Sequence, residues 1–172
     1  MRKLFLTLLF VPILCFAQIN KTIWGVTLGK STKQQVKTML VNKGYTVRVE
    51  PDGSLYVDVN NISFGGAYWT YIAFSFVDGK LYQVWFQNNE KQSPVKIEEA
   101  FKKTKNFLNE KYIHYSVEAR PSDTIEEVSD FADGKTYVSL MINRYHYQRY
   151  ISLSYADLQL DNLKNKRSTD EL

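Results

Sequence analysis

The sequence predicts an α+β fold in which two helices pack on an antiparallel sheet. Its most apolar stretch after the N-terminal segment, Phe64 to Asn88, holds two runs of aromatic and β-branched residues around Asp78-Gly79, a strong hairpin signal. Two amphipathic segments, 32–43 and 94–111, carry helix start and stop signals. Shorter runs bounded by Pro, Gly and Asn are typical of further strands.

The hairpin is expected to pair Trp69–Val77 with Leu81–Phe86. A two-residue loop would place Phe74 opposite Gln83, whereas a three-residue loop with a glycine bulge would shift every pair by one. The residues leave both registers open. Both faces are largely apolar in either register, so we expect the hairpin near the centre of the sheet, with at least one face under a helix.

The first 17 residues are organised like an export signal. Arg2 and Lys3 form a basic start, Leu4 to Phe16 is an apolar core, and small residues precede the expected cleavage site after Ala17 or Gln18. The apolar run is too short for a normal membrane span. We expect a mature chain that is periplasmic or secreted and has no stable membrane span. A buried N-terminal helix is the alternative.

Cys15 is the single cysteine of the chain. As the first mature residue it would carry a lipid anchor, but Leu14 before it is a poor fit, because lipoprotein signals prefer a small residue there. We therefore expect no anchoring at Cys15. Beyond this position the chain has no cysteine for a disulfide, a thiol nucleophile or a thiolate metal site.

The charge of the chain says little about its partners. It has 22 basic and 18 acidic residues, a net charge of +4, and without Arg2 and Lys3 the balance is 20 against 18, or +2. Together with export, this argues against nucleic acid as a ligand. The length suits one domain, expected at 18–163, followed by a frayed polar tail at 164–172.

The first half is expected to contain one helix and several strands. Ser31 as cap and Gln34 three residues later form a capping-box pattern for a helix at Thr32–Lys43, which ends before Gly44. Pro51-Asp52-Gly53 is a turn pattern, and Asn60-Asn61 turns the chain again. Strands are expected at Tyr45–Glu50, Leu55–Asn60 and Ile62–Phe64, and Ile23–Leu28 is expected to be a short strand or an extended lead-in.

The second half repeats this organisation. Ser93 is a cap and Pro94 the first residue of a helix at Pro94–Lys111. Strands are expected at His114–Arg120, Thr124–Phe131, Thr136–Ile142 and Tyr147–Tyr155.

Two segments of the chain are alike. Phe76–Tyr82 and Phe131–Tyr137 match at five of seven positions around Asp-Gly-Lys. One interpretation is that the chain consists of two tandem helix-plus-strands repeats. The other is that Asp-Gly-Lys is a favoured hairpin turn wherever it occurs. Both predict two helices on one antiparallel sheet.

The segment WGVTLGKSTKQQVKTMLVNKGY, followed by an aromatic hairpin containing DGKLYQV, resembles small exported domains of the SmpA/OmlA type. It is also similar to tandem-repeat β-lactamase inhibitor proteins, whose halves each put helices on an antiparallel sheet. The resemblance implies an exported binding module without catalysis. This chain departs from it in lacking a convincing lipobox and in having one expected helix per half, so no functional residue is carried over.

Two groups of residues are candidates for binding. Tyrosine and arginine are favoured at protein interfaces, and tyrosine rings also stack on sugars. Each group has a structural alternative: a strand end whose tyrosines cover the core for the first, and a simple bend at Gly65-Gly66 for the second. The first group is Arg144, Tyr145, His146, Tyr147 and Arg149, and the second is Tyr68, Trp69 and Tyr71.

No motif for catalysis or for a cofactor was found, so we expect no enzyme activity, no cofactor and no metal site. His114 and His146 are the two histidines, and neither belongs to a metal-spaced pair. An acidic series lacks the spacing of a calcium loop and favours a solvated strand edge. Its members are Asp123, Glu126, Glu127, Asp130 and Asp133.

The function expected from these observations is non-catalytic binding of a protein partner in the cell envelope or outside the cell. The alternative is binding of a carbohydrate or another small ligand by exposed aromatic residues. A flat apolar patch would favour the protein partner, and a groove lined by tyrosines with polar donors would favour the glycan. A cleft that brings a histidine to a carboxylate and a hydroxyl would indicate a hydrolase.

Overall fold

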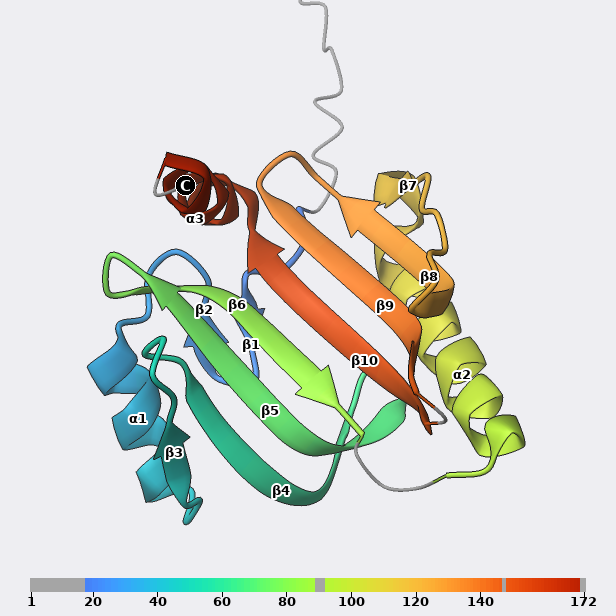
Figure 1. Cartoon of the computed structure of the whole chain (residues 1–172), viewed down its shortest axis with the longest axis horizontal. Coiled ribbons are helices and arrows are strands. Elements are labelled where there is room, and N and C mark those ends of the chain that lie inside the picture. Colours follow the sequence, from blue (N-terminus) through green and yellow to red (C-terminus); the bar gives the residue numbers. More distant parts are fainter. Residues whose placement is uncertain (1–17, 89–91, 147, 171–172) are drawn as a thin grey trace, which may run out of the picture.

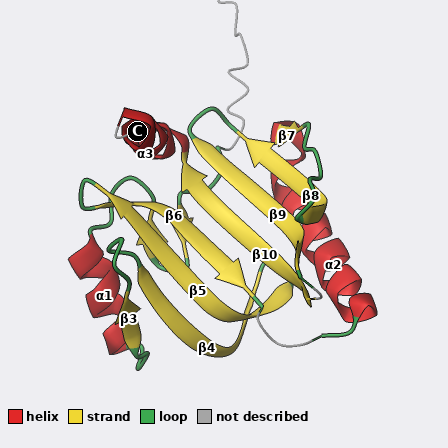
Figure 2. Cartoon of the chain, in the orientation of Figure 1, coloured by secondary structure: helices red, strands yellow, loops and turns green. Residues whose placement is uncertain are grey.

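A computed structural model gives the arrangement of residues 18–88, 92–146 and 148–170, and the expected export signal lies outside this range. The fold is α+β, as predicted, and its antiparallel sheet dominates it (Figure 2). The described part of the chain has three α-helices, so the expectation of two was wrong. None of these helices is both long and apolar enough to cross a membrane.

The main sheet has eight strands in the order β3-β4-β5-β6-β10-β9-β8-β7, and β1 and β2 form a small separate hairpin (Figure 1). The helices are α1 (Lys33–Asn42), α2 (Pro94–Tyr112), followed by a 3-10 turn at Ile113–Tyr115, and α3 (Leu158–Asp170). The strands are β1 (Thr22–Ile23), β2 (Val26–Thr27), β3 (Val47–Val49), β4 (Leu55–Phe64), β5 (Ala67–Val77), β6 (Lys80–Gln87), β7 (Ser116–Val117), β8 (Ile125–Ala132), β9 (Thr136–Tyr145) and β10 (Gln148–Asp157).

Each half of the chain is a helix followed by a four-stranded meander, and the two meanders join where β6 pairs with β10. The two Asp-Gly-Lys segments do not occupy equivalent places in these halves. Asp78-Gly79 joins the third and fourth strands of its half, whereas Asp133-Gly134 joins the second and third strands of the other. The sequence match therefore reflects turn chemistry rather than a position in a repeat.

The β5–β6 hairpin combines both registers that the residues left open. Asp78 and Gly79 have φ of 50° and 71°, as a two-residue turn of this type requires, and Phe76 lies opposite Leu81. The register then shifts, because Tyr82 is bulged, so that Phe74 lies opposite Val84 instead of Gln83.

Both predicted helices begin with a capping residue of the expected type, but the cap of α1 is one residue later than predicted. Thr32, not Ser31, caps α1: its hydroxyl accepts from the backbone N of Gln35, while its own N donates to the Gln35 side chain. Ser31 is occupied elsewhere, because its hydroxyl accepts from the backbone N of Thr27 at 2.9 Å. At α2 the Ser93 cap is as predicted.

α1 and α2 cover one face of the sheet and enclose the core. Along α2, Ile97, Phe101 and Leu108 are buried, as are Val36 and Leu40 of α1. Facing them from the central strands are Ile72, Phe74, Val84, Phe86, Leu140, Ile142, Leu153 and Tyr155. Burial of this single apolar face supplies the main driving force for the fold.

The predicted polar tail was wrong, because residues from Lys164 to Asp170 belong to α3. Asp157 begins this helix by accepting from the backbone N of Gln159 and of Leu160, each at 3.2 Å. Lys164 Nζ donates to the Tyr82 hydroxyl at 2.6 Å, and Arg167 makes a two-bond ion pair with Asp78. Side chains typical of a frayed end thus make tertiary contacts.

Several predicted strand boundaries also differ, and the run expected at Ile23–Leu28 is divided between β1 and β2 by a turn at Trp24-Gly25. The expected turn at Asn60-Asn61 is a bulge within a continuous β4, where the register shifts between Asp58 and Ile62. The expected strand at His114–Arg120 is reduced to β7, because a 3-10 turn continues α2 through Tyr115.

The tip of the β4–β5 hairpin, Gly65-Gly66, packs against the backbone of α2. A Cβ at Gly66 would lie 3.1 Å from the Lys103 carbonyl oxygen, and φ is +87° at this position. Glycine is thus required here by both the backbone conformation and the close approach to α2.

We predict that Gly66→Ala lowers the free energy of unfolding by about 2–4 kcal/mol, from left-handed strain plus contact with α2. Gly79→Ala is the matched control, because Gly79 also ends a two-residue hairpin turn with positive φ but has open space around it. It should cost only about 1–2 kcal/mol. Urea unfolding measures both, and equal losses would show that the α2 contact is unimportant.

Candidate functional site

The face of the sheet opposite α1 and α2 carries a row of three aromatic side chains. Tyr56 of β4, Tyr71 of β5 and Trp85 of β6 lie on neighbouring strands. The ring centroids of Tyr56 and Tyr71 are 5.4 Å apart, and those of Tyr71 and Trp85 are 6.3 Å apart at 88°. These are favourable separations for aromatic pairs. All three rings are half-buried, so part of each is accessible.

The three rings can lie close together because a small residue occupies the position between Tyr56 and Trp85. Ala73 of β5 is the cross-strand partner of both Tyr56 and Trp85. Directly opposite side chains on one face of a sheet are close neighbours, so a larger residue at this position would fill the space between the rings. Ala73 itself is buried beneath them.

A shallow depression of about 560 Å³ borders this aromatic row. The turn between β3 and β4 supplies its rim, and there Asp52 accepts from the backbone N and the hydroxyl of Ser54, both at 2.9 Å. These bonds hold the turn in place. The depression is lined by Glu50, Pro51, Asp52, Tyr56, Tyr71 and Trp85.

The charge states of this depression follow from burial and hydrogen bonding. Burial raises the pKa of Tyr71 to about 12, with a smaller contribution from Tyr56. Burial also raises the pKa of Tyr56, and the nearby Asp52 and Glu50 add to that effect. The Ser54 backbone N–H lowers the pKa of Asp52. At neutral pH the depression therefore offers two phenol hydroxyls as donors and an ionised Asp52 as acceptor.

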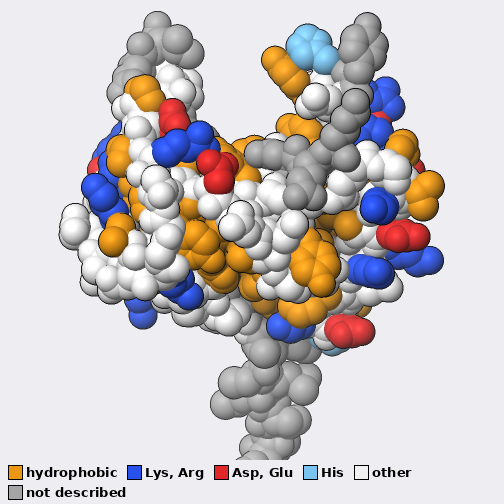
Figure 3. Space-filling view, turned by 90° about the horizontal axis from the view of Figure 1, so that it is seen from below, with side chains coloured by type: hydrophobic (Ala, Val, Ile, Leu, Met, Phe, Trp, Pro, Cys, Tyr) orange, Lys and Arg blue, Asp and Glu red, His pale blue; other side chains and the backbone are white. Residues whose placement is uncertain are grey.

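Beyond the aromatic row, this open face includes small serine side chains that are buried among larger neighbours. Ser154 lies opposite Trp85, and Ser139 lies opposite Ser154 on the next strand. Seen edge-on in Figure 3, the molecule is hollowed between two projections, α3 and the end of the β9–β10 hairpin. The open face is thus a trough with an aromatic row along one side.

The arginines of the first predicted binding group are engaged in ion pairs. Glu126 of β8 forms ion pairs with both Arg144 and Arg149, and the distance to Arg149 Nε is 2.6 Å. Arg149 also forms an ion pair with Glu98 of α2 at 3.2 Å. This network ties the start of α2 to three strands. The structural alternative accounts for these two arginines.

The rest of that group lies at the end of the β9–β10 hairpin. Tyr145 is 64% exposed, and its ring contacts that of His146, with centroids 4.4 Å apart. His146 has φ of 53° in the turn. Tyr147 lies outside the described residues. The structure does not bring this hairpin end to the aromatic row on β4–β6.

The second predicted group divides between core and surface. Trp69 is fully buried and donates its indole N–H to the Phe64 carbonyl oxygen at 2.8 Å, so its role as a binding residue is corrected to a core residue. Tyr68, its neighbour on the opposite face of β5, is 63% exposed. The glycines beside them pack on α2, which agrees with the bend interpretation.

The acidic series and the histidines do not converge. Asp130 accepts from the Tyr137 hydroxyl at 2.5 Å, and Asp133 accepts from the backbone N of Thr136 at 2.7 Å, so each has its own partner. His114 follows α2 beside β7, at the opposite end of β9 from His146. Among the described residues, no three His, Cys, Asp or Glu side chains are grouped to hold a metal.

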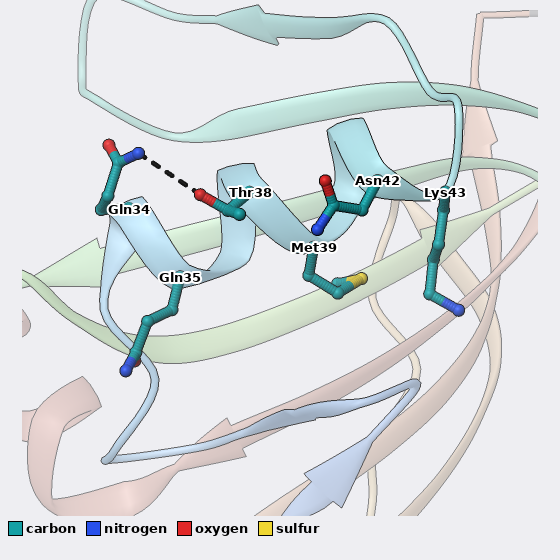
Figure 4. Close-up of a pocket in the computed structure, with 6 residues that line it drawn as sticks. All are labelled: Gln34, Gln35, Thr38, Met39, Asn42 and Lys43. Carbon is teal, nitrogen blue, oxygen red and sulfur yellow. Dashed lines mark hydrogen bonds between the residues drawn. The ribbon is translucent and has the colours of Figure 1, made fainter.

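A second depression, of about 540 Å³, runs along α1 (Figure 4). All six residues drawn there belong to this helix or its C-terminal cap, and Gln34 donates to the Thr38 hydroxyl at 3.4 Å. Because no other element contributes to it, this depression follows one helix surface and gathers no convergent chemistry.

Comparison with known proteins gives little information. No family model and no curated protein matches the chain. It is similar in structure to a DUF4309 family protein, YjgB from Bacillus subtilis, with a TM-score of 0.40 and 11% identity over 81% of this chain and 87% of that one. A likeness at this level supports no argument about function, and the resemblance to the SmpA/OmlA and inhibitor families stays a prediction.

We predict that Arg149→Met lowers the free energy of unfolding by about 1–2 kcal/mol, because the half-buried Glu126 loses one of its two partners. The methionine retains most of the apolar stem, so lost packing is small. Arg120→Met is the control, since Arg120 and its partner Glu118 are 84% and 80% exposed and such pairs contribute little. Urea unfolding that gave equal effects would contradict a structural role for the network.

The raised pKa of Tyr71 gives a second prediction. Between pH 10 and about pH 12 the unfolded chain loses this proton before the folded protein does, so the stability contributed by the neutral phenol declines as the pH rises through that range. Tyr71→Phe should therefore lose less stability between pH 9 and 11 than the unaltered chain, by about 1 kcal/mol or less, given partial solvent screening. Denaturant titrations at both pH values measure this, and parallel losses would contradict it.

Proposed function

We propose that the protein is an exported, non-catalytic binding module that holds a carbohydrate on the open face of its sheet. The observation that carries the proposal is the row of Tyr56, Tyr71 and Trp85 beside a depression rimmed by hydrogen-bonding groups. This is the tyrosine-lined groove with polar groups that the sequence analysis associated with a glycan.

The chemistry of a sugar matches this arrangement. A pyranose ring has faces of C–H groups that pack on an aromatic ring and an edge of hydroxyls that need hydrogen-bond partners. Ligand sites commonly combine such apolar walls with a few fixed polar groups. Here the rings supply the wall, the Tyr56 and Tyr71 hydroxyls donate, and the Asp52 and Glu50 carboxylates accept.

A binding role fits Asp52 better than catalysis does. A general acid that works near neutral pH needs a raised pKa, and the Ser54 backbone N–H lowers that of Asp52. Both of its oxygens already accept hydrogen bonds from Ser54, which fixes its orientation. The carboxylate is thus arranged as a permanent acceptor.

Export is part of the proposal and rests on the sequence of the first 17 residues. A basic start, an apolar core and small residues before Ala17 together are typical of a cleaved signal. Glycans of the cell envelope or its surroundings would then be accessible to the mature chain.

A protein partner is the second candidate. Tyr145 and His146 are exposed at the end of the β9–β10 hairpin, where a partner could contact them. That end is small and separate from the aromatic row, so a partner bound there would leave the glycan site open.

We predict that Trp85→Ala and Tyr71→Ala each weaken glycan binding at least tenfold, because each removes one stacking surface, a loss of about 1.4 kcal/mol or more. Tyr68→Ala is the control, since it removes an exposed tyrosine from the same strand outside the depression. A glycan array identifies the ligand and calorimetry measures the affinities. Thermal unfolding of each variant establishes that it is folded.

If no glycan binds to the array, the proposal fails. It also fails if a bound glycan is released equally by all three variants or by none of them. Recovery of a protein partner whose binding depends on Tyr145 would support the second candidate.

A further inference from the structure

We propose that the ligand of the aromatic depression carries a positive charge, and that it is an oligosaccharide with free amino groups. The inference rests on the proposed carbohydrate-binding function and specifies the chemical class of the sugar. Two independent features support it: the charges of the residues that line the depression and the aromatic surfaces that they flank.

The depression is lined by acidic groups and by no cationic one. Its charged lining residues are Glu50 and Asp52. Asp52 has a lowered pKa and remains ionised in mildly acidic solution. Within the described part of the chain, Glu50 forms no ion pair, so its carboxylate is available to a ligand.

Three cationic side chains lie close to the depression but outside its lining, and the first is Lys33, whose Nζ is 3.3 Å from where a Cβ on Gly53 would lie. Arg48 pairs with Asp58 at 3.2 Å, next to Tyr71 on the sheet. Lys164 of α3 is directed to the Tyr82 hydroxyl at 2.6 Å, although its charge still reaches Asp52. None of the three lines the depression, so the charged groups that a ligand there would contact directly are the two carboxylates.

The aromatic rings favour the same ligand charge. The face of a tyrosine or tryptophan ring attracts a cation, and several rings around one position form the arrangement that binds ammonium groups. Tyr71 and Trp85 meet at 88°, so their faces point in different directions around the depression. An ammonium group on a sugar would be attracted by the ring faces and by a carboxylate together, whereas a neutral sugar would stack on the rings and hydrogen-bond to the carboxylates without that charge attraction.

An anionic ligand is disfavoured by the same features. A uronic acid, a sulfated sugar or a phosphate would lie beside two carboxylates without a cationic partner in the lining. Like charges at this separation repel, which selects against such ligands.

Three tetrasaccharides of equal length and linkage test the inference by calorimetry. They are a β-1,4-glucosamine oligomer with free amines, its fully N-acetylated form and the neutral glucose oligomer, each at mildly acidic pH and low salt. We expect the free amine to bind at least tenfold more tightly than either neutral oligomer, and added salt to reduce this advantage.

Paired substitutions then locate the effect. Glu50→Gln with Asp52→Asn should remove the advantage of the amine over the neutral oligomers, and the amide introduced at position 52 retains a side-chain oxygen for the Ser54 backbone N–H. Glu118→Gln with Asp123→Asn removes the same charge from exposed positions at the other edge of the sheet and should change nothing.

The outcomes separate this inference from the proposed function. Equal or tighter binding of a neutral oligomer, lost in Trp85→Ala, would overturn the inference and leave carbohydrate binding in place. The inference would also be overturned if both paired substitutions lowered the preference for the free amine equally, because the overall charge of the protein would then be responsible for that preference. Failure of all three oligomers and of the wider glycan array would remove the proposed function itself.

Discussion

The antiparallel pairing of β6 with β10 joins two four-stranded meanders into one sheet, and both the core and the candidate site depend on its register. On the covered face this pairing places Phe86 opposite Leu153, both fully buried. On the open face it places Trp85 opposite Ser154. Since side chains alternate between faces, a slip by one residue would expose the core and bury the aromatic row. The same pairing also removes the long unpaired edge that each meander would otherwise present.

Two buried or half-buried carboxylates fix the ends of the described chain to this sheet. Asp133 accepts from the backbone N of Ile19 at 2.9 Å while it also holds its own turn. Asp157 pairs with Lys21 at 2.6 Å and begins α3. The described side chains of α3 are half-buried or exposed, so hydrogen bonds to charged groups supply much of its attachment, whereas the N-terminal segment also buries Ile19, Ile23, Val26 and Leu28 in the core. Asp133 thus has a structural role that a solvated edge did not predict.

Helix caps and turns were predictable from the sequence where a residue pattern fits only one local structure. Ser93-Pro94 starts α2, and Asp78-Gly79 forms a tight turn, because each is satisfied within a few residues. At α1 both Ser31 and Thr32 fit a capping box, and the choice depends on a bond from Thr27 to Ser31 across the preceding loop. Local patterns do not contain such a bond.

The features that the sequence did not predict depend on distant contacts. α3 lacks a clear apolar stripe and makes its contacts with Tyr82 and Asp78, far away in the chain. The aromatic row needs three strands in register, and bulges on both sides of β5 set that register. Tyr56 and Trp85 therefore look like ordinary strand residues in the sequence, and of the three only Tyr71 belonged to a predicted binding group.

The composition of the open face argues for a ligand rather than for another protein layer or bare solvent. A face that packs on a second layer carries large aliphatic side chains, as the covered face does with Leu140 and Leu153. A face meant only for water commonly carries long charged side chains. The centre of the open face has few of either: Ser139, Ser152 and Ser154 are buried there among half-buried neighbours such as Trp85 and Met141. The rings of the aromatic row keep part of their apolar surface accessible, and this accessible surface is what supports the proposed binding of a stacked ligand on this face.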